Sequence, residues 1–158
     1  MSSHPAKPST PWPEETGVWA TYNLHCHCGA VRLNVKVSPP FFESEAEGKG
    51  TYPVTECDCS YCERQGYQAV HPLQSNVCFT QGQDNLTKYY CGNKQNPHLF
   101  CKHCGSVMMT DLTAMGKFLP GDPRYTVNVR MLEDYDSSKL TIQKVEFMKN
   151  MPPKYTID

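Results

Sequence analysis

Hydrophobic and polar residues alternate along several short segments of the chain, a period of two that is typical of strands with one buried face. The clearest example is residues 30–37, which place their apolar side chains on one face: Val31, Leu33, Val35 and Val37. Residues 18–25 are rich in β-forming residues and lead into the sequence Cys26-His27-Cys28-Gly29. We therefore predict that the two segments pair as a hairpin around this tight turn.

The rest of the chain repeats this pattern of short segments between turns. Strands are predicted at residues 54–57, 77–80, 86–91, 98–101, 106–112, 125–131 and 140–147, and a turn of helix is predicted at 60–66. No long stretch has the helical period of 3.6 residues. The predicted fold is therefore all-β, a small sandwich or open barrel of short strands with few or no helices.

The length of 158 residues suits one domain with its own core. Residues 1–17 carry four prolines and little apolar content, so we expect a flexible N-terminal arm, docked, if at all, by Trp12. A single β domain is predicted over residues 18–148. Residues 149–158, which include two prolines, are predicted to form a tail.

Charge and hydropathy narrow the classes of partner. The net charge is −1 and lysine and arginine form no run, so nothing in the sequence predicts binding to nucleic acid or to an anionic membrane surface. No apolar run is long enough to span a bilayer, and the first residues lack the apolar core of an export signal. We expect a cytoplasmic protein, and the oligomeric state stays open, with a homodimer among the options.

Nine cysteines are a high count for a chain of this length. Their odd number and the missing export signal argue against a disulfide framework. Seven of them lie in tight clusters at residues 26–28, 57–62 and 101–104, whereas Cys78 and Cys91 stand alone. Cysteines two or three residues apart are poorly placed to join each other and well placed to converge on one metal ion.

Two of the clusters are short turns that supply four thiolates, the ligand set of a closed tetrahedral zinc site: Cys26, Cys28, Cys101 and Cys104. Gly29 and Gly105 follow the last cysteine of each turn, where a positive φ lets the backbone turn tightly. The alternatives are free buried cysteines or a redox pair of the thioredoxin type. The latter needs an α/β context that this sequence lacks.

The remaining cluster, Cys57, Cys59 and Cys62, offers three thiolates and no adjacent fourth cysteine. Three protein ligands and an open position are typical of a catalytic zinc site. A small thiol such as glutathione would be held there as a thiolate, ready to attack carbon or to leave from it. The alternative is a second structural site whose fourth ligand comes from a distance, from Cys78, Cys91, His71 or His98.

The order of these motifs is specific. Cys-x-Cys-Gly-Ala-Val at 26–31, Cys-x-Cys-Ser-x-Cys with a glycine four residues later at 57–66, and Phe-Cys-x-x-Cys-Gly-Ser at 100–106 together resemble the glutathione-dependent formaldehyde-activating enzyme family, which includes the centromere protein V group. Residues 82–90 and 127–130 add weaker likenesses, so the resemblance spans about residues 18–134.

The resemblance implies a β-rich fold related to a small zinc-binding Rab chaperone. It implies a structural zinc on Cys26, Cys28, Cys101 and Cys104 and a second, exchangeable zinc on Cys57, Cys59 and Cys62. The named activity of the family is the addition of glutathione to formaldehyde, and relatives handle other carbon–sulfur bonds, including those of glutathione adducts.

Further residues are candidates for substrate contacts. His98 is interpreted either as a proton shuttle or as a hydrogen-bond partner of a cysteinate. Arg64 and Arg130 can pair with a glutathione carboxylate, and Arg64 has the better claim because it lies close to Cys62. Several aromatic residues, Tyr61 in particular, line a substrate pocket or else pack in the core: Phe41, Phe42, Tyr52, Tyr61 and Tyr67.

Three hypotheses follow. The first is a glutathione-dependent carbon–sulfur lyase or synthase, acting on a glutathione conjugate whose sulfur binds at the three-cysteine zinc. The second is a non-catalytic scaffold or chaperone-like module with two structural zincs. The third is a thiol redox protein without zinc. The three hypotheses predict different metal contents and different responses of the protein to glutathione.

Overall fold

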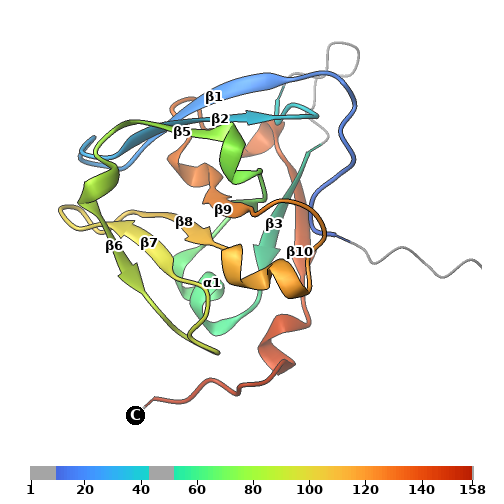
Figure 1. Ribbon diagram of the computed structural model, residues 1–158, viewed down its shortest axis with the longest axis vertical. Helices are drawn as coiled ribbons and strands as arrows, with labels where there is room; N and C mark the ends of the chain where they lie inside the picture. The colour runs from blue at the N-terminus through green and yellow to red at the C-terminus, as the bar shows by residue number, and fades with distance from the viewer. Residues whose placement is uncertain (1–9, 43–51, 158) are drawn as a thin grey trace, which may run out of the picture.

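A computed structural model describes residues 10–42 and 52–157, and in these ranges the chain is mostly β, with one short α-helix, α1 (Ser60–Gln65) (Figure 1). The predicted all-β class is confirmed, with two open sheets and no closed barrel among the described residues. Short 3-10 turns connect the strands at Gln74–Asn76, Gln83–Asn85, Thr113–Lys117, Val129–Met131, Ser137–Lys139 and Met148–Asn150. None of the described helices is long and apolar enough to cross a membrane.

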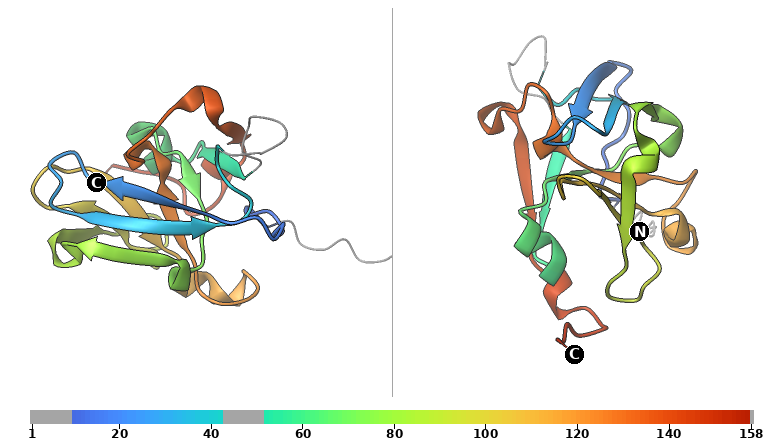
Figure 2. Two further views of the ribbon diagram at one scale, coloured as in Figure 1. Left: turned by 90° about the horizontal axis from the view of Figure 1, so that it is seen from above. Right: turned by 90° about the vertical axis from the view of Figure 1, so that its left-hand side faces the viewer.

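The strands form one small sheet and one large sheet. The three-stranded sheet has the order β1 (Ala20–His25), β2 (Arg32–Val37) and β5 (Val77–Gln81). The seven-stranded sheet has the order β10 (Thr141–Val145), β3 (Pro53–Cys57), β4 (Ala69–Val70), β9 (Tyr125–Asn128), β8 (Val107–Asp111), β7 (His98–Cys101) and β6 (Leu86–Tyr89). Figure 2 shows the small sheet lying across the large one.

The predicted hairpin forms from β1 and β2, which are antiparallel with Leu24 opposite Leu33. The buried residues alternate along β2 as the hydrophobic pattern predicts, and Leu33, Val35 and Val37 face the core. This alternation fixes the register, because a slip of one residue would turn the apolar face to water.

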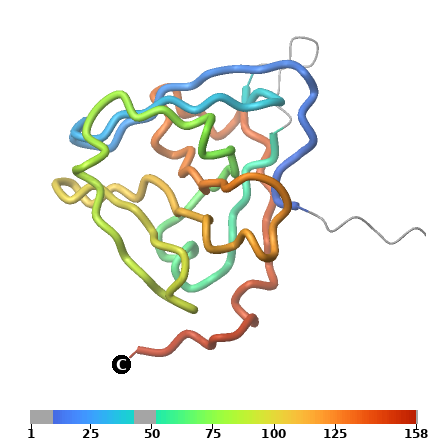
Figure 3. The backbone as a smooth tube through the Cα atoms, viewed as in Figure 1, coloured from blue at the N-terminus to red at the C-terminus, as the bar shows by residue number. Residues whose placement is uncertain are grey.

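Three features of the large sheet differ from the prediction. The strand expected at 125–131 ends at Asn128, because the Asn128 side chain accepts the backbone N–H of Arg130 at 3.2 Å and caps a 3-10 turn. Strand β4 has only two residues, too few to show a period. Strand β10 pairs in parallel with β3, more than 80 residues away in sequence (Figure 3).

The core lies between the two sheets and contains most of the large apolar side chains. Phe41 is fully buried and stacks on Tyr22 with ring centroids 4.7 Å apart, and it meets the buried Tyr52 edge to face. Phe41 and Tyr52, two of the aromatic residues considered as pocket-lining, therefore pack in the core.

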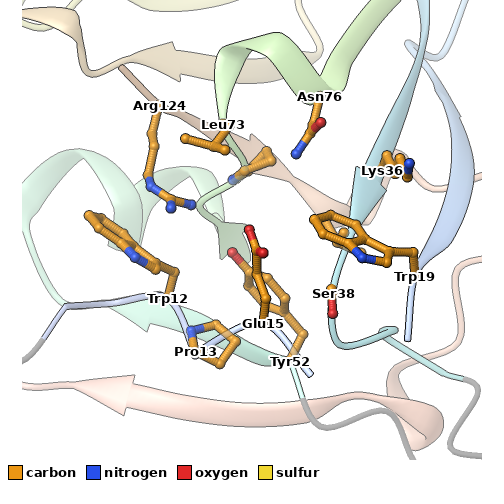
Figure 4. A pocket seen from close by; sticks show the side chains of 12 residues that line it. Trp12, Pro13, Glu15, Trp19, Lys36, Ser38, Tyr52, Leu73, Asn76 and Arg124 are labelled. Atoms are coloured by element: carbon orange, nitrogen blue, oxygen red, sulfur yellow. The ribbon is translucent and has the colours of Figure 1, made fainter. Parts of the chain in front are cut away.

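The start of the described chain contacts this core through Trp12. The Cζ atom of Arg124 lies 3.9 Å from the centroid of a Trp12 ring (Figure 4). Arg124 also donates to the carbonyl oxygen of His71 at 2.7 Å. Such a cation–π contact is favourable where it is partly desolvated. Trp12 thus docks residues 10–17, while residues 1–9 of the predicted arm lie outside the described ranges.

Candidate metal centres

All nine cysteines are free thiols, and seven of them form two clusters that can each hold a metal ion. The first cluster brings together four sulfur atoms within 4.8 Å of one another: Cys26, Cys28, Cys101 and Cys104. Two of the sulfur–sulfur distances are 3.6 Å (Cys26 to Cys28) and 3.7 Å (Cys28 to Cys101). The predicted four-cysteine set is therefore assembled.

The local backbone explains why these turns aim their sulfurs inward. The N–H of Val31 donates to the sulfur of Cys26 at 3.3 Å, and the N–H of His103 donates to that of Cys101 at 3.4 Å. Gly29 and Gly105 have φ values of 77° and 78°. The prediction of a positive φ at both glycines is confirmed, and a larger residue there would be strained.

The first cluster joins the two sheets at one end (Figure 1). Cys26 follows β1 in the small sheet, while Cys101 ends β7 in the large sheet. The hydroxyl of Ser106 adds a direct link, because it accepts the N–H of His27 at 3.0 Å and lies 3.2 Å from the sulfur of Cys104. Cys26 and Cys101 are fully buried, Cys104 is half-buried and Cys28 is exposed, and a metal ion bound by all four would tie the two sheets together.

The second cluster consists of Cys57, Cys59 and Cys62, with its three sulfurs also within 4.8 Å of one another. Cys57 ends β3, and Cys59 is the N-cap residue of α1. The sulfur of Cys59 accepts the N–H of Cys62 at 3.3 Å, and the sulfur of Cys57 accepts the N–H of Cys59 at 3.4 Å. The helix start, predicted at residue 60, thus sets the geometry of the cluster.

Because the three thiols lie close together, their pKa values differ strongly. Hydrogen bonds with Cys57 and Cys62 lower the pKa of Cys59 well below the ordinary value of a thiol, whereas hydrogen bonds with Cys57 and Cys59, together with partial burial, raise the pKa of Cys62. The cluster alone therefore favours one thiolate and holds protons on its neighbours. A cation is needed for all three sulfurs to be thiolates at once.

In the described residues, the second cluster includes none of the more distant ligands considered as a fourth donor: Cys78, Cys91, His71 and His98. The side chain of His71 is buried, and its backbone N–H donates to the hydroxyl of Tyr52 at 3.2 Å. Cys78 is exposed on the edge strand β5. Three sulfurs thus form the whole of this cluster.

A cavity of about 540 Å³ adjoins the second cluster. Cys57 and Cys62 line it directly, as does Tyr67, which is buried. Its walls carry charges of both signs: Arg130, Lys144, Lys149, Glu56, Asp58, Glu63 and Glu146. The cavity is large enough for a small-molecule ligand.

The two candidate arginines lie in different places. Arg130 lines the cavity, and its Nε donates to the carbonyl oxygen of Gly66 at 2.6 Å, which fixes the guanidinium. Arg64 donates to the carbonyl oxygen of Ser60 at 3.0 Å within its own helix, and its Cζ lies 4.9 Å from the ring centroid of Tyr155. The side chain of Arg64 therefore points from α1 toward Tyr155 in the C-terminal tail.

Two lysines that belong to none of the sequence motifs, Lys144 and Lys149, also line the cavity. They reach the cavity because β10 pairs with β3 and because the N–H of Lys149 donates to Asp58 at 3.1 Å. No local signal in the sequence indicates this long-range pairing.

Tyr61 and His98 meet beside the second cluster. Their rings stack with centroids 3.8 Å apart, and Tyr89 stacks on the same tyrosine at 5.9 Å. Among the described residues, the hydrogen-bond contacts of the His98 ring are with Thr110 and Cys91 and not with a clustered cysteine. Burial lowers the pKa of His98, and the negative charge of Cys59 partly opposes this shift. His98 is thus a neutral imidazole close to the cluster.

Comparison with known proteins supports the fold. No protein-family model matches the chain. The chain is similar to a Rhodobacter sphaeroides protein whose crystal structure was determined in the Northeast Structural Genomics programme, with 29% sequence identity and a TM-score of 0.54. The match covers 73% of this chain and 92% of that one. This likeness supports the arrangement of the sheets and does not identify a reaction.

Proposed function

We propose that the protein is a glutathione-dependent carbon–sulfur lyase or synthase, and that the sulfur of a glutathione adduct binds beside Cys57, Cys59 and Cys62. The single observation that carries the proposal is the contrast between the two clusters. One has four sulfurs and joins two sheets, whereas the other has three and borders a cavity of about 540 Å³. The motif resemblance to the formaldehyde-activating family supports the same assignment.

Zinc is the metal that the donor sets suit. Four sulfurs placed tetrahedrally about 2.3 Å from a zinc ion lie about 3.8 Å apart. The distances of 3.6 and 3.7 Å in the first cluster agree with this spacing. We infer that this cluster holds a structural zinc and that the three-cysteine cluster holds a second zinc.

The second zinc, when bound, would supply positive charge that keeps an incoming thiol as a thiolate at neutral pH. Residues of the chain itself form the rest of the site. Cys57 and Cys62 border the cavity, so a ligand in it can bring its sulfur to the cluster. In the synthase direction the ligand's sulfur forms a bond to a carbonyl carbon, and the carbonyl oxygen takes the thiol's proton. The lyase direction reverses both changes.

The mixed charges of the cavity suit glutathione, which carries two carboxylates and one ammonium group. Arg130 is held by Gly66 in a fixed orientation and can form a paired contact with a carboxylate. Lys144 and Lys149 can take the other carboxylate, and Glu63 can take the ammonium group. A reducing compartment such as the cytoplasm would keep the cysteines available to metal.

Isothermal titration of glutathione against the zinc-loaded protein tests the proposal. We expect saturable binding that Cys59→Ser abolishes, because that change removes one of the three ligands. Arg130→Gln should weaken binding by about tenfold, the loss of one charged hydrogen bond. Lys117→Gln, on a 3-10 turn that does not line the cavity, is the matched control. Absence of thiol-dependent heat from the wild-type protein would favour the scaffold hypothesis instead.

A further inference from the structure

Outside the two clusters, one more cysteine has a chemically active neighbour. Cys91 lies in the loop between β6 and β7, and its sulfur is 3.3 Å from Nε2 of His98. The other ring nitrogen of His98, Nδ1, lies 2.7 Å from the hydroxyl oxygen of Thr110. Thiol, imidazole and a group that can orient the imidazole are thus in successive contact, the arrangement of an activated nucleophile.

The contact between His98 and Thr110 allows His98 to act as a base toward Cys91. The Thr110 hydroxyl lies 2.7 Å from Nδ1 of His98 and 3.4 Å from the hydroxyl of Tyr67, which in turn lies 2.8 Å from the hydroxyl of Thr126. In the tautomer with the proton on Nδ1, His98 donates to Thr110, and Nε2 presents its lone pair to the thiol of Cys91, as a general base requires.

Burial favours the neutral form of both members of this pair. Burial raises the pKa of Cys91 and lowers the pKa of His98, and the negative charge of Cys59 raises both pKa values, so that it adds to the first shift and partly opposes the second. The thiol proton stays on sulfur until a reaction draws it to Nε2. Cys91 is half-buried, so an electrophile can reach it.

The surroundings indicate the class of electrophile. The rings of Tyr61 and His98 are nearly parallel, at 18°, and those of Tyr61 and Tyr89 are inclined by 26°. Together they form a flat aromatic stack next to the thiol, which suits a planar conjugated compound. A thiol is a soft nucleophile and adds to the β-carbon of such compounds.

We propose that Cys91 is a nucleophilic thiol that adds to α,β-unsaturated carbonyl compounds, with His98 as its base and Thr110 as a positioning residue. The sulfur forms a bond to the β-carbon, and the π pair of the C=C bond moves to the α-carbon through the enolate. The proton passes from sulfur to Nε2 of His98 and then to the α-carbon. Nothing is oxidised or reduced, and the step needs neither metal nor glutathione, so it stands apart from the proposed function.

Cys78 provides an internal control, because it is exposed whereas Cys91 is half-buried. Cleavage by trypsin after Lys88 and Lys94 places the two cysteines on different peptides. The zinc-loaded full chain is treated with limiting acrylamide, and mass spectrometry of the peptides follows the modification of each cysteine over time. If access alone decided the rates, Cys78 would react first.

We expect Cys91 to react about tenfold faster than Cys78, and we expect His98→Gln to slow Cys91 by about the same factor, since a positioned base contributes at least this much. Thr110→Val, which keeps the shape of the side chain, should slow Cys91 without changing the rate at Cys78. Thermal unfolding of each variant shows that it is folded. Faster reaction at Cys78 than at Cys91 in the wild-type protein, or an unchanged Cys91 rate in a folded His98→Gln variant, would overturn the proposal.

Discussion

At the scale of single residues, the number of sulfur ligands separates two clusters that share the same chemistry. Cys26 and Cys101 are fully buried, Cys104 is half-buried and Cys28 is exposed, whereas Cys57, Cys59 and Cys62 are all half-buried, and Cys57 and Cys62 line a cavity. A metal bound by the first set would have four protein sulfurs and so a complete tetrahedral ligand set. A metal bound by the second set could gain a ligand from solution, which is the basis of the proposed function.

His71 offers a test of how burial acts on one residue. Burial, and secondarily the positive charge of Arg124, lower its pKa to about 4 from an ordinary value near 6.5. At acid pH the unfolded chain therefore binds a proton that the folded chain does not, so this contribution to stability is complete above about pH 6.5 and is lost as the pH falls toward 4. We expect the free energy of unfolding to drop by about 2 kcal/mol between pH 7 and pH 5 from this residue.

Chemical denaturation at the two pH values measures the drop, with His71→Leu as the control. The variant keeps the backbone hydrogen bonds of residue 71 to Tyr52 and Arg124 and lacks the titrating ring. Acid-induced loss of metal affects both proteins alike and cancels in the comparison. Equal pH dependence in the two proteins would contradict the assignment.

The candidate metal ligands could be predicted from the sequence because cysteine spacing is a local property. Both sets assembled as the spacing indicated. The choice between Arg64 and Arg130 could not be made in this way. Arg64 is near Cys62 in sequence, yet α1 directs it to Ser60 and Tyr155, and Arg130 reaches the cavity from the end of β9.

At the scale of elements, side-chain caps decide where several elements end. Cys59 caps α1 with its sulfur, so one residue serves both the helix and the candidate metal centre. Asn128 ends β9 and begins the 3-10 turn that carries Arg130. The apolar alternation at 125–131 could not reveal this end, because a polar cap acts through hydrogen bonds and leaves the hydrophobic pattern unchanged.

Asn128 should be among the most sensitive polar residues in the fold. Only 2% of its surface is exposed, and it donates to the carbonyl oxygen of Val107 at 2.9 Å while accepting the N–H groups of Gln68 and Arg130. Asn128→Ala leaves these buried groups without partners. We expect a loss of about 3 kcal/mol in the free energy of unfolding, measured by denaturant titration.

Asn93→Ala is the matched substitution at the surface. Its side chain accepts the N–H of Gln95 in an exposed loop, so the change should cost less than about 0.5 kcal/mol. Similar losses for the two variants would show that the Asn128 network does not hold β9, β8 and the 3-10 turn together.

At the scale of the whole molecule, the first cluster links two sheets that share one hydrophobic core. The all-β class followed from the period of two and the absence of helical periodicity. The order of the strands could not be predicted from this pattern, because the parallel pairing of β10 with β3 joins segments that no turn connects. The cavity depends on that pairing, since Lys144 and Val145 of β10 form part of its wall.

Removing one ligand from each cluster should therefore have different effects on metal content and on stability. Cys101→Ser is expected to lose the first metal and the folded state, because a structural zinc contributes about 10 kcal/mol. Cys59→Ser should retain one zinc per chain and nearly the wild-type melting temperature. Metal analysis and thermal unfolding by circular dichroism measure both properties, and equal destabilisation of the two variants would mean that both metals are structural.

The most direct test of the central claim replaces zinc with cobalt(II), whose sulfur-to-metal charge-transfer absorption grows with the number of bound thiolates. On adding glutathione to the cobalt-loaded protein, we predict a saturable rise in this absorption, as a fourth sulfur joins Cys57, Cys59 and Cys62. S-methylglutathione, which has no free thiol, should produce no rise. An unchanged spectrum with glutathione, or an equal change with both compounds, would contradict the account.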